Sequence, residues 1–184
     1  MSDELLVRHC SPTLAGLKTG NLFACPFDDI AELLGAVRRW NRLLGKKGLR
    51  MIPLRVEEQR ALIYLYRPGR LARDLQQDTA RQLLQRYGYG TQTPVRCVSL
   101  LRNRLGKGGE FPHEIGLFLG YPPEDVQGFI ENKPNSCKSV GFWKVYGDVQ
   151  KAQKTFARYQ KCTKIYCDCH ASGRSVERLA VAER

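Results

Sequence analysis

The sequence has no stretch suited to cross a membrane, because none of its apolar runs comes near the roughly 20 residues that span a bilayer. Its N-terminus, MSDELLVRHC, contains two acidic side chains and no long apolar core, so we expect no secretory signal. Internal repeats and low-complexity segments are also missing. We therefore expect a globular cytoplasmic protein that works without a membrane.

A closed disulfide framework is not indicated either. The chain has seven cysteines, an odd number, and no regular pairing in their spacing. In a reducing compartment such residues are mostly small buried hydrophobic side chains, and a minority are metal ligands or nucleophiles. Each cysteine therefore has to be judged by its neighbours in the sequence.

Acidic side chains are scarce in one part of the chain. Residues 35–107 contain seventeen basic and four acidic side chains, and this segment accounts for the whole net charge of +12. Such a face can attract nucleic acid or an acidic ligand. The alternative is an arginine-rich surface that only keeps the protein in solution, since no aromatic-interleaved binding motif accompanies the charge.

The pattern of apolar residues and turn signals predicts an α+β fold. Helices are predicted over residues 3–19 (interrupted at Pro12), 30–44, 71–87, 94–105 and 123–132, and from Asp148 onward. Strands are predicted at residues 21–25, 49–56, 61–66, 115–119 and 139–146, with a further short one at 175–181. We expect a single domain over residues 1–184, with a mixed β-sheet of about five strands including one hairpin and helices packed on its faces. Residues 166–184 are a candidate for a loosely attached tail.

The segment RHCSPTLAGLKTGNLF gathers polar groups into a short, broken stretch that begins at Arg8. Cys10 lies beside His9 and ahead of Lys18, and basic neighbours can lower the pKa of a thiol and activate it as a nucleophile. Lys18 and Asn21 are candidate ligand contacts, because Pro12 and the following glycines favour a shaped loop. The alternative is a buried Cys10 with Lys18 at the surface.

His113 and Glu114 follow Pro112 and precede an apolar run. If both lay in a strand they would point to opposite faces and could not act on one substrate together. If the strand begins at Ile115, His113 can serve as a base and Glu114 can orient it. The alternative is that His113 bonds to a turn and Glu114 pairs with an arginine.

Lys144 and Tyr146 alternate with Trp143 and Val145 in the segment VGFWKVYGD. In a strand, Lys144 and Tyr146 would share a face and could bind an acidic ligand. The alternative is that both only cover the surface of the sheet.

Three thiols and an imidazole lie close together near the C-terminus. Cys162, Cys167, Cys169 and His170 are the ligand types that zinc prefers, and iron is a second candidate. Their spacing differs from that of common zinc knuckles, and no second ligand pair is obvious. The sequence thus gives a weak signal for metal binding.

Four motifs together resemble an uncharacterised bacterial family, domain of unknown function 3793. They are RHCSPTLAGLKTGNLF, FPHEIGLFLGYPPEDVQGFI, WKVYGD and YQKCT, and they run from Arg8 to Thr163. The resemblance implies a single domain over nearly the whole chain and implies no particular reaction. It directs attention to the residues within these motifs: His9, Cys10, Lys18, Asn21, His113, Glu114, Lys144, Tyr146 and Cys162.

The preferred hypothesis is one polar cleft, where the N-terminal loop meets the loop before Ile115. Cys10 would be its thiol, and His113 or His9 the proton partner. This arrangement would suit a thiol-dependent enzyme, a redox protein or a binder of a small or acidic ligand. The other hypotheses are a basic nucleic-acid-binding module using residues 35–107 and a metal-handling protein.

Overall fold

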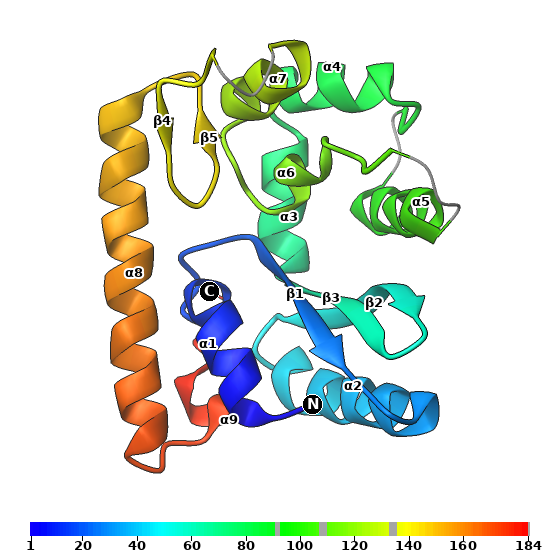
Figure 1. Cartoon of the computed structure of the whole chain (residues 1–184), viewed down its shortest axis with the longest axis vertical. Helices are drawn as coiled ribbons and strands as arrows, with labels where there is room; N and C mark the ends of the chain where they lie inside the picture. Colours follow the sequence, from blue (N-terminus) through cyan, green and yellow to red (C-terminus); the bar gives the residue numbers. More distant parts are fainter. Residues whose placement is uncertain (91–92, 107–109, 133–135, 184) are drawn as a thin grey trace.

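A three-stranded antiparallel sheet lies at the centre of the molecule, between two groups of helices (Figure 1). The computed structural model describes residues 1–90, 93–106, 110–132 and 136–183. The strands are β1 (Gly20–Pro26), β2 (Arg50–Glu57), β3 (Arg60–Tyr66), β4 (Ser139–Val140) and β5 (Lys144–Val145). The helices are α1 (Asp3–Leu14), α2 (Ile30–Gly45), α3 (Pro68–Leu75), α4 (Asp78–Arg86), α5 (Pro94–Gly106), α6 (Ile115–Phe118), α7 (Pro123–Glu131), α8 (Val149–Ala171) and α9 (Val176–Leu179).

The central strand β3 supplies side chains to two separate hydrophobic cores. Successive side chains of a strand point to opposite faces of the sheet. Ala61, Ile63 and Leu65 accordingly enter a core that also contains side chains of α1, α2 and α9. Tyr64 and Tyr66 enter the second core, which α3 to α7 complete. A strand buried on both faces has no polar alternation, which explains the apolar run of β3.

The predicted β-hairpin is confirmed. Strands β2 and β3 pair antiparallel, and the strand order β1-β3-β2 makes β2 an edge strand. The register shifts between Pro53 and Arg55, so Pro53 lies at an irregularity of an edge strand. Proline has no N–H to donate, and this is a position where a sheet tolerates it.

The prediction of one mixed sheet is wrong, although the α+β class and five strands are confirmed. The five strands form two sheets: β1, β3 and β2 make one, and the short ribbon of β4 and β5 makes the other. All three strand pairings among the described residues are antiparallel. The ribbon packs on α8 through Trp143 and Val145, with Phe156 and Tyr159 of the helix opposite.

Two predicted strands are helices. Residues 115–118 form α6, and residues 176–179 form α9. All four residues of α6 are buried, so the segment lacks the polar positions that would distinguish a helical from an extended period. The Ser175 side chain caps α9 by accepting from the Arg178 N–H. Both helices are shorter than two turns, which leaves little periodicity to detect.

The predicted helix over residues 71–87 is two helices, α3 and α4, separated by Gln76 and Gln77. The first predicted helix, over residues 3–19, ends earlier, at Leu14, and the remaining predicted helices are confirmed in position. The Asp29 side chain caps α2 and the Asp148 side chain caps α8, each by accepting a backbone N–H of the first turn. Pro12 lies inside α1 rather than ending it.

The C-terminal segment packs against the rest of the chain and is not a loosely attached tail. α8 continues to Ala171, and the chain then turns back so that Val176 and Leu179 enter the same core as α1 and α2. Figure 1 shows α8 running along one side of the molecule, past α1 and the β4–β5 ribbon. Over the described residues, no helix is both long enough and apolar enough to cross a membrane.

Candidate functional site

Two cavities that share part of their walls contain five of the predicted site residues. The first, here called the apolar cavity, has a volume of about 430 Å³ and is walled by β1, α6, α7 and the β4–β5 ribbon. The second, here called the basic cavity, has a volume of about 630 Å³ and is walled by α1, β1 and α8. Leu22, Leu119 and Tyr121 line both cavities. The two spaces therefore share one boundary.

The turn after α1 places Lys18 at this boundary. The carbonyl of Pro12 accepts the N–H groups of Leu17 and Lys18, at 2.8 and 3.0 Å, which folds the chain back under the helix. Gly16 makes this turn with a φ of +73°, a conformation that favours glycine. The Lys18 Nζ then donates to the Gly20 carbonyl at 2.7 Å and lies 5.2 Å from the centre of the Tyr121 ring.

Lys18 is a buried amine, with only 3% of its surface exposed. None of the ion pairs among the described residues involves it. Burial disfavours the charged form and lowers the pKa of Lys18 to about 7, against a smaller opposing effect of Cys10. Near neutral pH this side chain is thus divided between the ammonium and the free amine.

The rest of the basic cavity is lined by further basic side chains. Arg8, His9 and Lys164 line it together with Lys18, and none of its described lining residues is an aspartate or a glutamate. His9 stacks on Phe23, with the ring centres 5.9 Å apart. Asn21 is held in place by the Thr13 hydroxyl, which donates to its side-chain oxygen at 2.6 Å.

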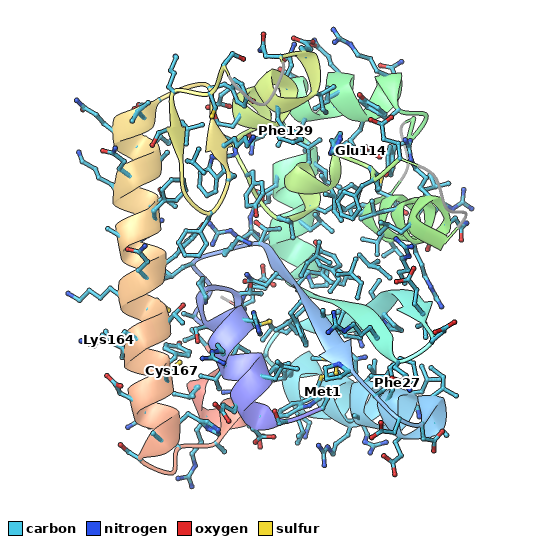
Figure 2. All side chains as sticks on the ribbon, in the orientation of Figure 1. Met1, Phe27, Glu114, Phe129, Lys164 and Cys167 are labelled. Carbon is cyan, nitrogen blue, oxygen red and sulfur yellow. The ribbon has the colours of Figure 1, made fainter. Side chains whose placement is uncertain are left out.

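Aromatic side chains make up much of the apolar cavity. Its wall includes Phe111, Phe129 and Trp143, with His113 edge-on to Phe129 at 4.9 Å between ring centres. Lys144 also lines this cavity, and its Nζ lies 5.8 Å from the centre of the Phe129 ring. Figure 2 labels Phe129 on α7, which lines the apolar cavity, and Lys164 on α8, which lines the basic cavity.

The buried carboxylate of Asp125 in α7 fixes the β4–β5 ribbon against the apolar cavity. It accepts the indole N–H of Trp143 and the backbone N–H groups of Tyr146 and Gly147, each at 2.7 Å. These three bonds hold Trp143 and Lys144 at the wall of the cavity. Tyr146 lines neither cavity: its ring packs closely against Gly128, and its buried hydroxyl has no hydrogen-bond partner among the described residues.

Comparison with known families gives one result. Residues 6–180 match the model of a family described as "Protein of unknown function (DUF3793)". The chain belongs to this family. A search of the curated proteins and a search of the solved structures each gave no match. All lining residues of both cavities fall within the part that the DUF3793 model matches.

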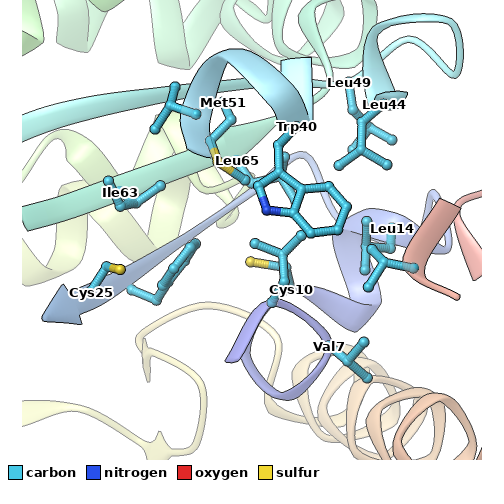
Figure 3. Close-up of a cluster of buried hydrophobic side chains, with 14 of the residues drawn as sticks. Val7, Cys10, Leu14, Cys25, Trp40, Leu44, Leu49, Met51, Ile63 and Leu65 are labelled. Carbon is cyan, nitrogen blue, oxygen red and sulfur yellow. The ribbon is translucent and has the colours of Figure 1, made fainter. Parts of the chain in front are cut away.

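Cys10 is not part of either cavity. It lies in the core beside Val7, Leu14 and Trp40, as Figure 3 shows, and none of its surface is exposed. Burial raises the pKa of its thiol, with a smaller opposing effect of Lys18, so the structure gives the opposite of the lowered pKa that the sequence suggested. A buried, protonated thiol is a poor nucleophile.

His113 and Glu114 do not form a pair. His113 lines the apolar cavity, and its Nε2 lies 3.8 Å from the Glu110 carboxylate. Glu114 is fully buried and points elsewhere: its Oε1 accepts the Tyr89 hydroxyl at 2.9 Å and lies 3.3 Å from the Arg104 Nε. Neither side chain approaches Cys10. Glu114 thus has the arginine pairing that the sequence left open as its alternative.

The C-terminal cysteines and His170 all lie on α8. Cys162 is buried, Cys167 and Cys169 are half-buried, and the His170 Nδ1 lies 3.1 Å from the Arg174 carbonyl. Within the described residues, no three histidine, cysteine, aspartate or glutamate side chains are grouped so that they could hold a metal ion. The structure therefore gives no support to a zinc or iron site in this segment.

The described basic residues of segment 35–107 do not all lie on one helix or one strand. They are spread over α2, β2, β3, α3, α4 and α5. Arg38 and Arg39 are exposed on α2, whereas Arg67 is buried and Arg104 pairs with Glu114. Nucleic-acid binding by this segment stays a prediction.

The sequence predicted some of the residues that line each cavity. It selected His9, Lys18 and Asn21, which share the basic cavity, and His113 and Lys144, which share the apolar one. It missed Arg8, Tyr121 and Lys164. Arg8 is the first residue of one of the motifs that resemble the family, so the sequence alone could have identified it as a candidate. Lys164 joins Arg8 only because α8 packs along α1, which no local pattern reveals.

Proposed function

We propose that this chain binds a small organic anion with an apolar body. The apolar part would occupy the apolar cavity, and the acidic group would occupy the basic cavity. The observation that carries the proposal is the shared boundary: Leu22, Leu119 and Tyr121 line both spaces. One elongated ligand passing these three residues would contact aromatic walls at one end and cationic groups at the other.

The charge of the basic cavity supports an acidic group. Four basic side chains line it, and no acidic one does. A cavity walled by protein focuses such a field more strongly than an open surface. Lys18 is the strongest case, because a buried ammonium without an ion-pair partner among the described residues is unfavourable until an anion arrives.

The walls of the other cavity support an apolar body. Aromatic side chains bury large apolar areas when a ligand enters, at roughly 25 cal/mol per Å². Phe111, which lines the apolar cavity, and Phe142, which lines the basic one, remain 46% and 40% exposed. Exposed aromatic rings at the edges of a hollow are typical of a surface that receives a partner molecule.

A binding role agrees with these features better than a thiol-dependent or redox role. The predicted nucleophile Cys10 is enclosed in the core, and burial raises the pKa of its thiol. The cavities themselves are lined by amines, imidazoles and aromatic rings, and no cysteine is among their lining residues. These groups bind and orient anions without covalent sulfur chemistry.

The test compares octanoate with octanol, which share a chain length and differ in charge. Binding is followed by calorimetry and by tryptophan fluorescence, since Trp143 lines the apolar cavity whereas Trp40 lies in a separate core. We expect octanoate to bind about tenfold more tightly than octanol, which corresponds to about 1.4 kcal/mol. Equal affinities, or no saturable binding of either, would contradict the proposal.

Matched variants on α8 locate the acidic group. Lys164 lines the basic cavity, whereas Lys161 is exposed on the same helix and lines neither cavity. Lys164→Ala should weaken octanoate binding severalfold and leave octanol binding unchanged, and Lys161→Ala should change neither. If both variants weaken octanoate equally, the attraction comes from the general positive surface and not from this cavity.

A further inference from the structure

Lys18 combines three properties that lysines rarely share. It is 97% removed from solvent, as its 3% exposure shows, yet it borders a cavity large enough for a ligand. Its nitrogen is held by one hydrogen bond, to the Gly20 carbonyl, and by the face of the Tyr121 ring. No carboxylate lies within ion-pair distance among the described residues. Lysines are almost never buried unless they are paired.

The nitrogen of Lys18 also lies close to a residue that lines both cavities. Lys18 lines the basic cavity, and the ring beneath its Nζ belongs to Tyr121, which lines both. A ligand that extends from the apolar cavity past Tyr121 into the basic cavity would bring the end that carries its carboxylate close to this nitrogen.

Burial also puts the amine into a reactive form. It lowers the pKa of Lys18 to about 7, so a large share of the molecules carry a free lone pair at neutral pH. A desolvated lysine of this kind is the usual nucleophile for carbonyl compounds. An exposed lysine keeps its ordinary pKa and is almost entirely protonated under the same conditions.

We propose that Lys18 forms an imine with a carbonyl-bearing organic acid, of the α-keto acid class, held across the two cavities; this inference rests on the proposed function. The Nζ lone pair attacks the carbonyl carbon, and the electron pair of the C=O bond moves to oxygen, which takes up a proton. The nitrogen loses one proton, which gives the neutral carbinolamine. Its hydroxyl takes up a second proton and leaves as water while the C=N bond forms, and the nitrogen then returns its remaining proton to solvent to give the imine. One water is released, and nothing is oxidised or reduced.

The neighbouring groups suit this reaction. His9 lines the same cavity and can exchange the protons that the addition and the dehydration require. Arg8 and Lys164 are placed to hold the carboxylate, which leaves the adjacent carbonyl for Lys18. The Tyr121 phenol, whose pKa burial raises to about 12, stays neutral and does not draw the ammonium form of Lys18 into an ion pair.

Reductive trapping with α-ketooctanoate tests the proposal. The full chain is incubated with this acid and sodium cyanoborohydride, which reduces an imine to a stable secondary amine. We expect one adduct per chain, with the mass of the ligand less one oxygen atom, and a lost tryptic cleavage after Lys18. Labelling of Lys18 should be on the order of tenfold faster than labelling of Lys161, which is exposed and lines neither cavity.

Octanoate serves as a competitor that cannot form an imine, because it has the same chain length and no keto group. An excess of octanoate should abolish the adduct at Lys18 and leave the slow labelling of exposed lysines unchanged. Lys18→Met should remove the fast adduct. Should that variant not fold, the peptide map of the unmodified chain still decides the question.

Three results can be told apart. Fast labelling of Lys18 that octanoate prevents supports the imine. Binding of octanoate without labelling of Lys18, or labelling of Lys18 no faster than of Lys161, overturns the imine and leaves the proposed function standing. If neither acid binds, the proposed function fails together with this inference.

Discussion

At the scale of the single residue, Lys18 makes the stability of the fold depend on pH. Its pKa is about 7 in the folded protein and returns to the ordinary value of 10.5 on unfolding. Between these pH values the unfolded chain binds one proton more than the folded chain, so stability rises with pH and is lost as the pH falls towards 7. From pH 7 to pH 9 we expect a gain of about 2 kcal/mol from this residue.

Urea unfolding at both pH values, on the wild type and on Lys18→Met, measures this gain. The difference in unfolding free energy between the wild type and Lys18→Met should change by the stated amount between the two pH values, because methionine has no proton to bind. The comparison with the variant is needed because burial raises the pKa of the thiols of Cys10, Cys25, Cys97 and Cys162, and these groups act with the opposite sign as the pH approaches 9. An equal pH dependence of the two proteins would show that Lys18 does not contribute to it.

At the scale of the element, the β4–β5 ribbon depends on a single carboxylate of α7. Asp125→Ala would leave the Trp143 indole and the Tyr146 and Gly147 N–H groups without their acceptor. Unsatisfied buried donors are costly, so we expect a loss of about 3 kcal/mol in unfolding free energy. Because the ribbon supplies Trp143 and Lys144 to the apolar cavity, octanoate binding should weaken as well.

Glu124→Ala is the matched control for this change. Glu124 precedes Asp125 in the same helix, is exposed and takes no part in these three hydrogen bonds. It should unfold within about 0.5 kcal/mol of the wild type, as most surface substitutions do. Denaturant titrations of both variants, read by tryptophan fluorescence, compare the two. Equal losses would mean that Asp125 does not anchor the ribbon.

Elements that carry their own signals were predictable from the sequence. The aspartate caps before α2 and α8 and the polar turn between β2 and β3 each lie within a few residues of the structure they determine. Helix α6 carries no such signal, because a short segment buried on every side has the same composition in either conformation. Helix α9 has a serine cap but spans only four residues, too few for a helical period to show. The division into two sheets depends on contacts between distant segments.

The candidate site, too, could be predicted only in part from the sequence. Local patterns selected Lys18 and His113 as polar residues in unusual surroundings, and both line a cavity. The same patterns favoured Cys10 and could not show that its side chain points into the core. The order of residues in a short loop says which groups are near one another along the chain. It does not say which face of α1 each of them occupies.

At the scale of the whole molecule, Arg67 joins segments from both ends of the chain. It lies where β3 passes into α3 and is buried, with 2% of its surface exposed. Its guanidinium donates to the carbonyls of Thr13, Leu14 and Val181, each at 2.8 Å, and to that of Lys47 at 3.3 Å. One side chain thus connects the end of α1, the turn after α2 and the C-terminal segment.

Beyond α9, the chain is bonded through this group and two backbone hydrogen bonds. The Val181 N–H donates to the Leu14 carbonyl at 3.0 Å, and the Glu183 N–H donates to the Lys47 carbonyl at 3.1 Å. Both of these carbonyls are also acceptors of Arg67. Each carbonyl oxygen has two lone pairs, so the guanidinium and the C-terminal backbone can share it.

Arg67→Lys should therefore release the C-terminus while keeping the charge. A lysine ammonium cannot reproduce the planar fork that reaches several carbonyls at once, so we expect a loss of about 3 kcal/mol in unfolding free energy. Hydrogen exchange at the Val181 amide should accelerate more than exchange in β3, because the segment can then open without global unfolding. Arg73→Lys is the control: Arg73 is exposed and meets the same segment only through Glu183 at 3.3 Å, a surface pair worth little. If Arg67→Lys protects Val181 as well as Arg73→Lys does, the C-terminus is held by its apolar contacts with α1 and α2 and not by the guanidinium.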